Sequence, residues 1–302
     1  MFLRIAALSP FLFFTAFAQE PTTSFRADTT LVVIPVSVTD KTNRYVLGLD
    51  KQNFQIVEDG VRQTITHFSS EDAPLSIGLI VDISGSIGSE IETSRRAAGE
   101  FLKTLNAGDE VFLVECSDQA QLALHFTQDT ADVNSKLKSA STGGLTALLD
   151  AVRLGIDEMK SAKNPRKALL VISDGGDNNS RYTSGQVEDL VRQADVQIFA
   201  MGVFEPFTFG LRGSAELSGP RLLSEISEQT GGRALAASGS QDLPGLASRI
   251  GLELRNQYVL AYSPTNNGRD GKFRHVQVTL KAPEALPELK ARWRTGYFAP
   301  SQ

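Results

Sequence analysis

One acid and two serines stand at alternate positions directly after a short apolar run, and residues of these types could bind a cation. The apolar run is 77–81, and Asp82, Ser84 and Ser86 follow it. Such a run is typical of a buried parallel strand, and open α/β sheets bind ligands at the carboxyl ends of their strands. Carboxylate and hydroxyl oxygens suit a hard cation such as Mg²⁺. Taken alone, the same residues could be helix caps or turn formers.

Two further segments carry residues of the same kinds. Thr146 lies in the glycine-rich stretch 141–150 at the expected start of a helix, where Thr146 or Thr142 could instead be a helix cap. Asp174 follows the strand-like run 168–173 and precedes two glycines, which is also the pattern of a turn. These segments strengthen the expectation of one site built from several loops.

Alternating strand-like and helix-like segments between residues 76 and 251 would position these residues. The alternation predicts an α/β fold, a doubly wound and mostly parallel sheet with helices on both faces. Strands 111–116 and 121–126 are too close in the chain for a crossover helix, so we expect them to form an antiparallel hairpin. The expected strands are 77–81, 111–116, 121–126, 168–173 and 196–203, and the expected helices are 91–105, 145–159, 185–194, 221–230 and 243–255.

The regions on both sides of this alternation contain strand-like runs instead. Neither flank alone has enough strands to bury a core. We therefore expect the flanks to pair into a small β-sandwich-like domain that contains the α/β domain as an insertion. The alternative is that they extend opposite edges of the central sheet. The expected strands are 30–38, 53–57, 63–68, 257–262, 273–280 and 290–297, and the expected limits are 19–73 and 253–302 for the β domain and 74–252 for the α/β domain.

The first eighteen residues have the pattern of a secretory signal peptide. Arg4 precedes an apolar stretch that ends in the small-x-small triplet 16–18. The expected mature chain begins at Gln19 and is exported to the periplasm or the cell exterior. An uncleaved N-terminal anchor is the alternative, although the stretch is shorter than the roughly 20 residues of a membrane span.

The composition is that of an ordinary soluble globular protein. The 302 residues include 41% hydrophobic and 22% charged residues, and the formal net charge of -5 argues against nucleic-acid binding through phosphate neutralisation. A single cysteine, Cys116, excludes an intramolecular disulfide, and its apolar surroundings are typical of a buried thiol. His67, His125 and His275 show no metal-ligand spacing.

Together, the motifs resemble the metal-ion-dependent adhesion site of von Willebrand factor type A domains. That site combines Asp-x-Ser-x-Ser after the first strand, a threonine in a glycine-rich loop, and Ser-Asp-Gly after a later strand. The loop 143–146 has one residue more than the commoner Gly-Gly-Thr, so Thr142 is the alternative threonine. The resemblance covers residues 74–250, and all five motif positions have a matching residue: Asp82, Ser84, Ser86, Thr146 and Asp174.

The resemblance implies a metal-dependent adhesion module without catalysis. In the family, the two serines and the threonine bind the cation directly or nearly so, and the two aspartates hold it partly through water. An open coordination position would take a Glu or Asp side chain of a partner protein. The implied cation is Mg²⁺, with Mn²⁺ or Ca²⁺ as alternatives.

The flanks resemble the secreted bacterial proteins grouped as VWFA-related (acidobacterial type). The residues that carry this likeness are Leu47 and Leu49, the run 53–60, Phe68, the run 257–262 and the run 296–298. The likeness extends over nearly the whole mature chain.

Two other classes of function stay open at this point. A structural protein could bind the metal for stability alone, or an acid of its own β domain could close the site. A hydrolase could use Ser84 or Ser86 as nucleophile, but the sequence has no Gly-x-Ser-x-Gly elbow, metalloprotease helix or phosphate loop. The polar residues 177–180 are expected to form a solvated rim of the site.

Overall fold

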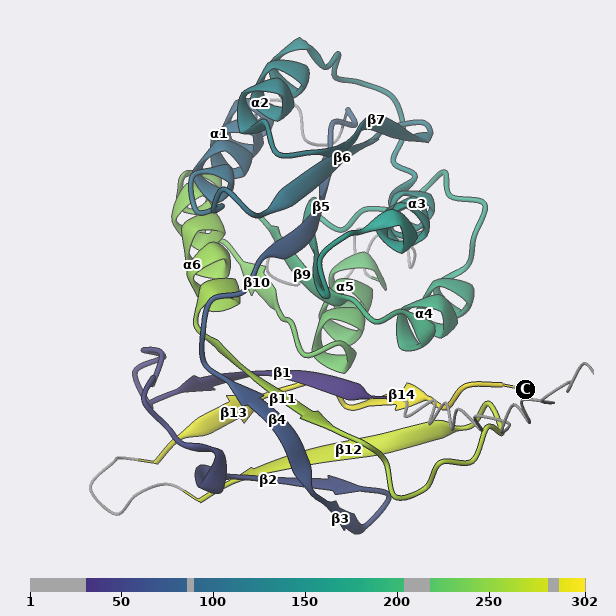
Figure 1. Ribbon diagram of the computed structural model, residues 1–302. Helices are drawn as coiled ribbons and strands as arrows, with labels where there is room; N and C mark the ends of the chain where they lie inside the picture. The colour runs from purple at the N-terminus through teal and green to yellow at the C-terminus, as the bar shows by residue number, and fades with distance from the viewer. Residues whose placement is uncertain (1–30, 86–89, 204–217, 282–287, 302) are drawn as a thin grey trace, which may run out of the picture.

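The computed structural model describes residues 31–85, 90–203, 218–281 and 288–301. Within them, a layered α/β domain stands on a β sandwich (Figure 1). The expected signal peptide, residues 1–18, and the candidate ligand Ser86 lie outside the described residues.

A six-stranded sheet forms the centre of the α/β domain. Its strands are β5 (Leu75–Asp82), β6 (Glu110–Cys116), β7 (Ala120–Thr127), β8 (Arg166–Ile172), β9 (Gln197–Gly202) and β10 (Ala234–Ala236). They lie in the order β10-β9-β8-β5-β6-β7. Every neighbouring pair is parallel except β6 and β7, which form the expected antiparallel hairpin.

Helices cover both faces of this sheet (Figure 1). They are α1 (Ile91–Leu102), α2 (Thr130–Ser139) and α6 (Leu243–Arg255) on one face, and α3 (Leu148–Glu158), α4 (Ser184–Gln193) and α5 (Ser218–Gln229) on the other. Alternate residues of β5 point to opposite faces, so Leu79 joins the first core and Ile80 the second. The expected doubly wound α/β fold is confirmed.

Helix α2 and strand β10 are additions to the elements expected from the sequence. Helix α2 buries only Val133 and Leu137, which is too short an apolar pattern to identify a helix. Its start is marked by Asp129, whose carboxylate accepts hydrogen bonds from the N–H groups of Ala131 and Asp132.

The strands of the two flanks pair with each other rather than with the central sheet. They are β1 (Val32–Thr39), β2 (Phe54–Glu58), β3 (Val61–Gln63), β4 (Ile65–Ser69), β11 (Gln257–Tyr262), β12 (Phe273–Leu280), β13 (Lys290–Arg292) and β14 (Gly296–Phe298). The sheet orders are β13-β1-β11-β4 and β14-β12-β2-β3, so each sheet contains strands of both flanks. The single strand expected at 290–297 divides into β13 and β14, because the chain crosses there from one sheet to the other.

The core of the sandwich unites both sheets and both flanks. Ile34 of β1, Ile56 of β2 and Tyr258 of β11 are fully buried in it. The buried carboxylate of Glu58 accepts hydrogen bonds from the hydroxyls of Tyr262 and Tyr297, at 2.7 and 2.8 Å. These contacts join one strand of the first flank to two strands of the second.

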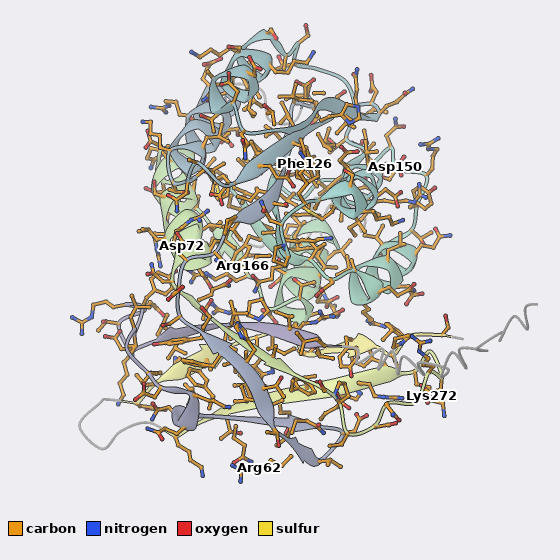
Figure 2. All side chains as sticks on the ribbon, viewed as in Figure 1. Arg62, Asp72, Phe126, Asp150, Arg166 and Lys272 are labelled. Carbon is orange, nitrogen blue, oxygen red and sulfur yellow. The ribbon has the colours of Figure 1, made fainter. Side chains whose placement is uncertain are left out.

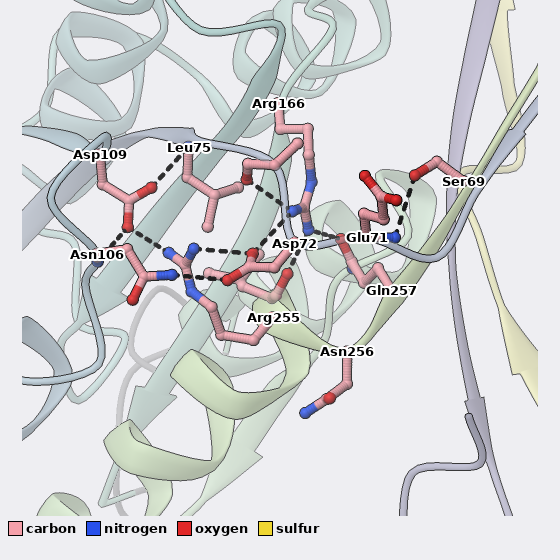
Figure 3. Close-up of polar contacts among 12 residues, drawn as sticks. Ser69, Glu71, Asp72, Leu75, Asn106, Asp109, Arg166, Arg255, Asn256 and Gln257 are labelled. Carbon is pink, nitrogen blue, oxygen red and sulfur yellow. Dashed lines mark hydrogen bonds and ion pairs between the residues drawn. The ribbon is translucent and has the colours of Figure 1, made fainter. Parts of the chain in front are cut away.

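Two connections link the sandwich to the α/β domain, and both lie at the amino end of β5. One is residues 70–74 between β4 and β5, and the other is Asn256 between α6 and β11. Asp72 and Arg166 meet at this junction (Figure 2). Arg255 forms ion pairs with Asp72 and Asp109, and Arg166 reaches the carbonyl of Ala73 and the side chain of Gln257 (Figure 3).

Cys116 at the end of β6 is fully buried, as its apolar surroundings predict. Burial raises the pKa of its thiol well above the usual range, so little thiolate forms at neutral pH. We expect Ellman's reagent to detect no thiol in the folded protein and one thiol per chain after denaturation in guanidinium. Fast reaction of the folded protein would contradict this placement of Cys116.

Candidate metal site

The register of two parallel strands brings Asp82 and Asp174 to one edge of the central sheet. Strand β5 pairs with β8, and Val81 lies opposite Ile172. Asp82 therefore ends its strand beside Ser173, whose hydroxyl donates a 2.8 Å hydrogen bond to the Asp82 carboxylate. Asp174 follows Ser173 directly, so two of the three motif segments share this carboxyl edge.

The glycine-rich loop before α3 is attached to the loop after β5. The N–H of Gly143 donates to the carbonyl of Ile83, and the N–H of Gly85 donates to the carbonyl of Gly144, both at 3.0 Å. Gly143 and Gly144 have φ angles of 142° and 81°, which are accessible mainly to glycine. These contacts bring the third motif segment to the same edge.

Thr146 is the more deeply placed of the two candidate threonines. It is 1% exposed, whereas Thr142 is exposed. The loop after β8 holds the backbone of Thr146 in place. The Thr146 carbonyl accepts hydrogen bonds from the N–H groups of Asn178 and Asn179, and the Thr146 N–H donates to the side chain of Asn178. The helix expected from residue 145 begins at Leu148, so Thr146 belongs to the loop. This placement favours Thr146 as the site's threonine.

Asp82 is a buried carboxylate with hydroxyl groups and a second acid, Asp174, around it. It is fully buried, and it accepts hydrogen bonds from the N–H of Ser84 at 2.9 Å and from the hydroxyls of Ser84 and Ser173. Burial raises its pKa, and the charge of Asp174 acts in the same direction. The residues with the largest effects on this pKa are Ser84, Ser173 and Asp174, and none of them is basic. Two acids and several hydroxyl oxygens without a basic partner fit a divalent cation.

The structure brings four of the five predicted ligands to this edge: Asp82, Ser84, Thr146 and Asp174. Ser84 is fully buried, and Asp174 is half-buried. Of the residues that the structure describes, no three His, Cys, Asp or Glu side chains are grouped to hold a metal ion. A metal site here would therefore depend on the hydroxyl oxygens as well as on the two aspartates.

Two further acids position the loops, and the sequence pattern predicts this role for neither of them. The carboxylate of Asp118, in the turn between β6 and β7, accepts from the N–H of Leu145 at 2.6 Å. Its carbonyl accepts from the side-chain amide of Asn179 at 2.7 Å. Asp118 thus ties the turn after β6 to the loop before α3 and to the loop after β8. An acid in a short polar turn has no sequence signal that distinguishes this task from turn formation.

Asp177 caps helix α3 and does not belong to a solvated rim. Its carboxylate accepts from the N–H of Leu148 at 2.9 Å and from the hydroxyl of Ser180. Helix α3 needs this acceptor because its own N-cap residue, Ala147, has no side-chain acceptor. The expected rim is correct for Asn178 and Asn179, which are exposed. Ala147 stands at the N-cap of α3 and its side chain cannot accept a hydrogen bond, so the cap has to come from another segment of the chain.

The substitution Asp118→Ala is expected to weaken cation binding without removing a ligand. The N–H of Leu145 would lose its acceptor, and the loop that carries Thr146 would be less well ordered. Residues that support metal ligands typically change affinity by about 10- to 100-fold. Calorimetric titration with Mg²⁺ measures the effect, and Asp189→Ala, which removes an exposed acid of α4, is the matched control. Equal affinities of the two variants would exclude the positioning role.

The fold and the loop cluster define an open-sheet α/β domain with the candidate ligand residues at its carboxyl edge. Residues 77–176 match the family model of the von Willebrand factor type A domain. The match covers 100 of the 302 residues and identifies a von Willebrand factor type A domain within this chain. Domains of this family are generally protein-interaction modules rather than enzymes.

Similar proteins come from several bacteria. An uncharacterized protein of Borreliella burgdorferi is 28% identical over 181 residues, and the match covers 53% of each chain, so this chain spans about half the length of that curated relative. A von Willebrand factor type A structure from Catenulispora acidiphila has 11% identity and a TM-score of 0.53, and covers 91% of this chain and 74% of that one. This likeness shows a shared fold.

A further solved structure is BatB from Bacteroides thetaiotaomicron, described as a conserved hypothetical protein. It has 17% identity and a TM-score of 0.47, and the match covers 60% of this chain and 98% of that one. In the part of the present chain that the structure describes, no helix has both the length and the apolar character needed to cross a bilayer.

Proposed function

We propose that this protein is an exported, metal-dependent protein-binding module whose cation joins it to an acidic side chain of a partner. One observation carries the proposal: Asp82 is fully buried beside Asp174, surrounded by hydroxyl groups and without a basic partner among the described residues. Such an arrangement is costly for two acids alone and favourable with a divalent cation between them.

The ligands would be the hydroxyl oxygens of Ser84, Ser86 and Thr146, with Asp82 and Asp174 acting partly through bound water. Mg²⁺ is the proposed cation, and Mn²⁺ or Ca²⁺ are the alternatives. When bound, the ion would supply a coordination position for a carboxylate oxygen. The two aspartates together balance a charge of +2, so they leave no excess negative charge to repel an acidic partner.

The position of the site favours an external partner over closure by the chain's own β domain. The sandwich connects to the amino end of β5, whereas Asp82 ends that strand. Seven steps of about 3.3 Å separate the two ends by about 23 Å. The acids of the sandwich that the structure describes are therefore far from the loops of the site.

The placement of the histidines supports a non-catalytic role. A serine nucleophile needs a base within hydrogen-bond reach. His67 lies on β4, His125 on β7 and His275 on β12, so none of the three belongs to the site loops. The hydroxyl of Ser84 interacts with Asp82 instead.

The test measures metal binding and partner binding separately. Titration with Mn²⁺, followed by electron paramagnetic resonance, is expected to show one site per chain. Immobilised protein is expected to capture a partner from envelope extract in Mg²⁺, to release it with a chelator or excess free glutamate, and to recapture it when Mg²⁺ is restored. Capture that survives chelation would overturn the metal-bridged mechanism. A chelator that lowers only the melting temperature would indicate a structural metal.

A further inference from the structure

A cavity of about 460 Å³ lies between the two domains, at the edge of the central sheet opposite the candidate metal site. Its walls come from the amino ends of β8 and β9, the carboxyl ends of α4 and α5, and strands β1, β12 and β14. Its volume falls in the range of small-molecule sites, and interfaces between domains are common places for such sites. The function proposed above makes no use of this cavity.

One wall of the cavity is apolar and belongs to the sandwich. Val33 and Pro35 alternate along β1 with residues of the sandwich core, so they face out of it and into the cavity. Phe273 of β12 and Phe298 of β14 also line it, and their half-buried rings meet edge to face with centroids 5.1 Å apart. This wall offers contact to an apolar chain or ring.

The opposite wall is basic, in a chain whose net charge is -5. Asp195, the acidic residue among those that line the cavity, is paired with Arg294. Lys167 donates to the carbonyl of Met159 at 3.4 Å and forms no ion pair with another described residue. Arg192 forms only long ion pairs, at 3.6 and 3.7 Å, with acids on its own helix. Lys167 and Arg192 therefore have charge available for an anion.

We infer that this cavity binds a small amphipathic carboxylate, whose apolar body lies against Phe273 and Phe298 and whose carboxylate lies near Lys167 and Arg192. The apolar wall supplies most of the contact, and the basic wall selects the charge. Because the walls come from both domains, the bound ligand would stabilise their junction. The inference is independent of the proposed cation site, which lies at the other edge of the sheet.

Decanoate is the probe, and decanol is its uncharged counterpart. Calorimetric titration of the full chain is expected to show one decanoate site, with at least tenfold weaker binding of decanol, because one charged hydrogen bond is worth about a factor of ten. Binding is also expected to change the fluorescence of Trp293, the single tryptophan of the chain, which precedes Arg294 in the cavity wall.

Two substitutions test the two walls. Lys167→Gln is expected to weaken decanoate about tenfold and to leave decanol unchanged. Lys160→Gln removes the same charge from an exposed lysine outside the cavity and should leave decanoate binding unchanged. Val33→Phe is expected to fill the cavity and to weaken both ligands.

Three results would overturn the inference. They are the absence of saturable decanoate binding, decanol binding as tight as decanoate, and equal decanoate affinity of Lys167→Gln and Lys160→Gln. Melting curves followed by circular dichroism establish that each variant is folded. If Val33→Phe fails to fold, the matched pair of lysine variants still decides the question.

Discussion

The substitution Asp82→Asn is expected to lower cation affinity by at least about a hundredfold while leaving the metal-free protein as stable as the wild type or more stable. Asparagine keeps the size of the side chain and a carbonyl oxygen that can accept from the N–H of Ser84. It removes a buried negative charge whose pKa burial raises and whose neighbour, Asp174, is also an acid. Without metal, the loss of this buried charge removes an unfavourable contribution to the stability of the fold. With metal, the same loss removes a negative charge that attracts the cation.

Thermal unfolding with and without Mg²⁺ measures both parts of this expectation. Mg²⁺ is expected to raise the melting temperature of the wild type, because a ligand that binds only the folded state stabilises it. The same addition should have no effect on Asp82→Asn. Asp189→Asn, which neutralises an exposed acid of α4, is expected to behave as the wild type. Strong destabilisation of metal-free Asp82→Asn, with the Mg²⁺ effect intact, would show that Asp82 is structural.

The substitution Glu253→Ala is expected to destabilise the protein by about 3 kcal/mol, because removing one member of a buried ion pair leaves its partners unpaired. Glu253 belongs to α6 and is fully buried. It pairs with Arg233 at 2.6 Å and, across the domain boundary, with Arg292 of β13 at 3.2 Å. It also accepts from the hydroxyl of Tyr45, whose pKa burial and the Glu253 charge raise to about 12.

Urea unfolding followed by Trp293 fluorescence and by circular dichroism measures this loss. Trp293 follows β13 in the sandwich, whereas most of the helical signal comes from the α/β domain, so separate transitions would reveal uncoupled domains. Leu252→Ala alters an exposed side chain in the same helical turn and should change stability by less than about 0.5 kcal/mol. A Glu253→Ala variant as stable as Leu252→Ala would show that the buried pair contributes no net stability.

The central sheet and the candidate ligands could be predicted from the sequence because their signals are local. A parallel strand buried on both faces is a continuous apolar run, and it ends where polar residues begin, as at Asp82 and after Ile172. Helices with an apolar stripe were identified for the same reason, and α2, which buries only Val133 and Leu137, was not. The likeness to the type A domain rested on five residues in three such segments.

The sequence by itself therefore determined where most strands and most helices lie and which residues are candidates for the metal site. Tertiary structure alone decided which flank strands pair, how Asp118 and Asp177 hold the loops, and which walls enclose the interdomain cavity. These features depend on contacts between distant residues, such as Tyr45 with Glu253, 208 positions apart, and Glu58 with Tyr297, 239 positions apart. Local periodicity records that a side chain is buried or polar, but the partner that it meets is set only when the chain has folded.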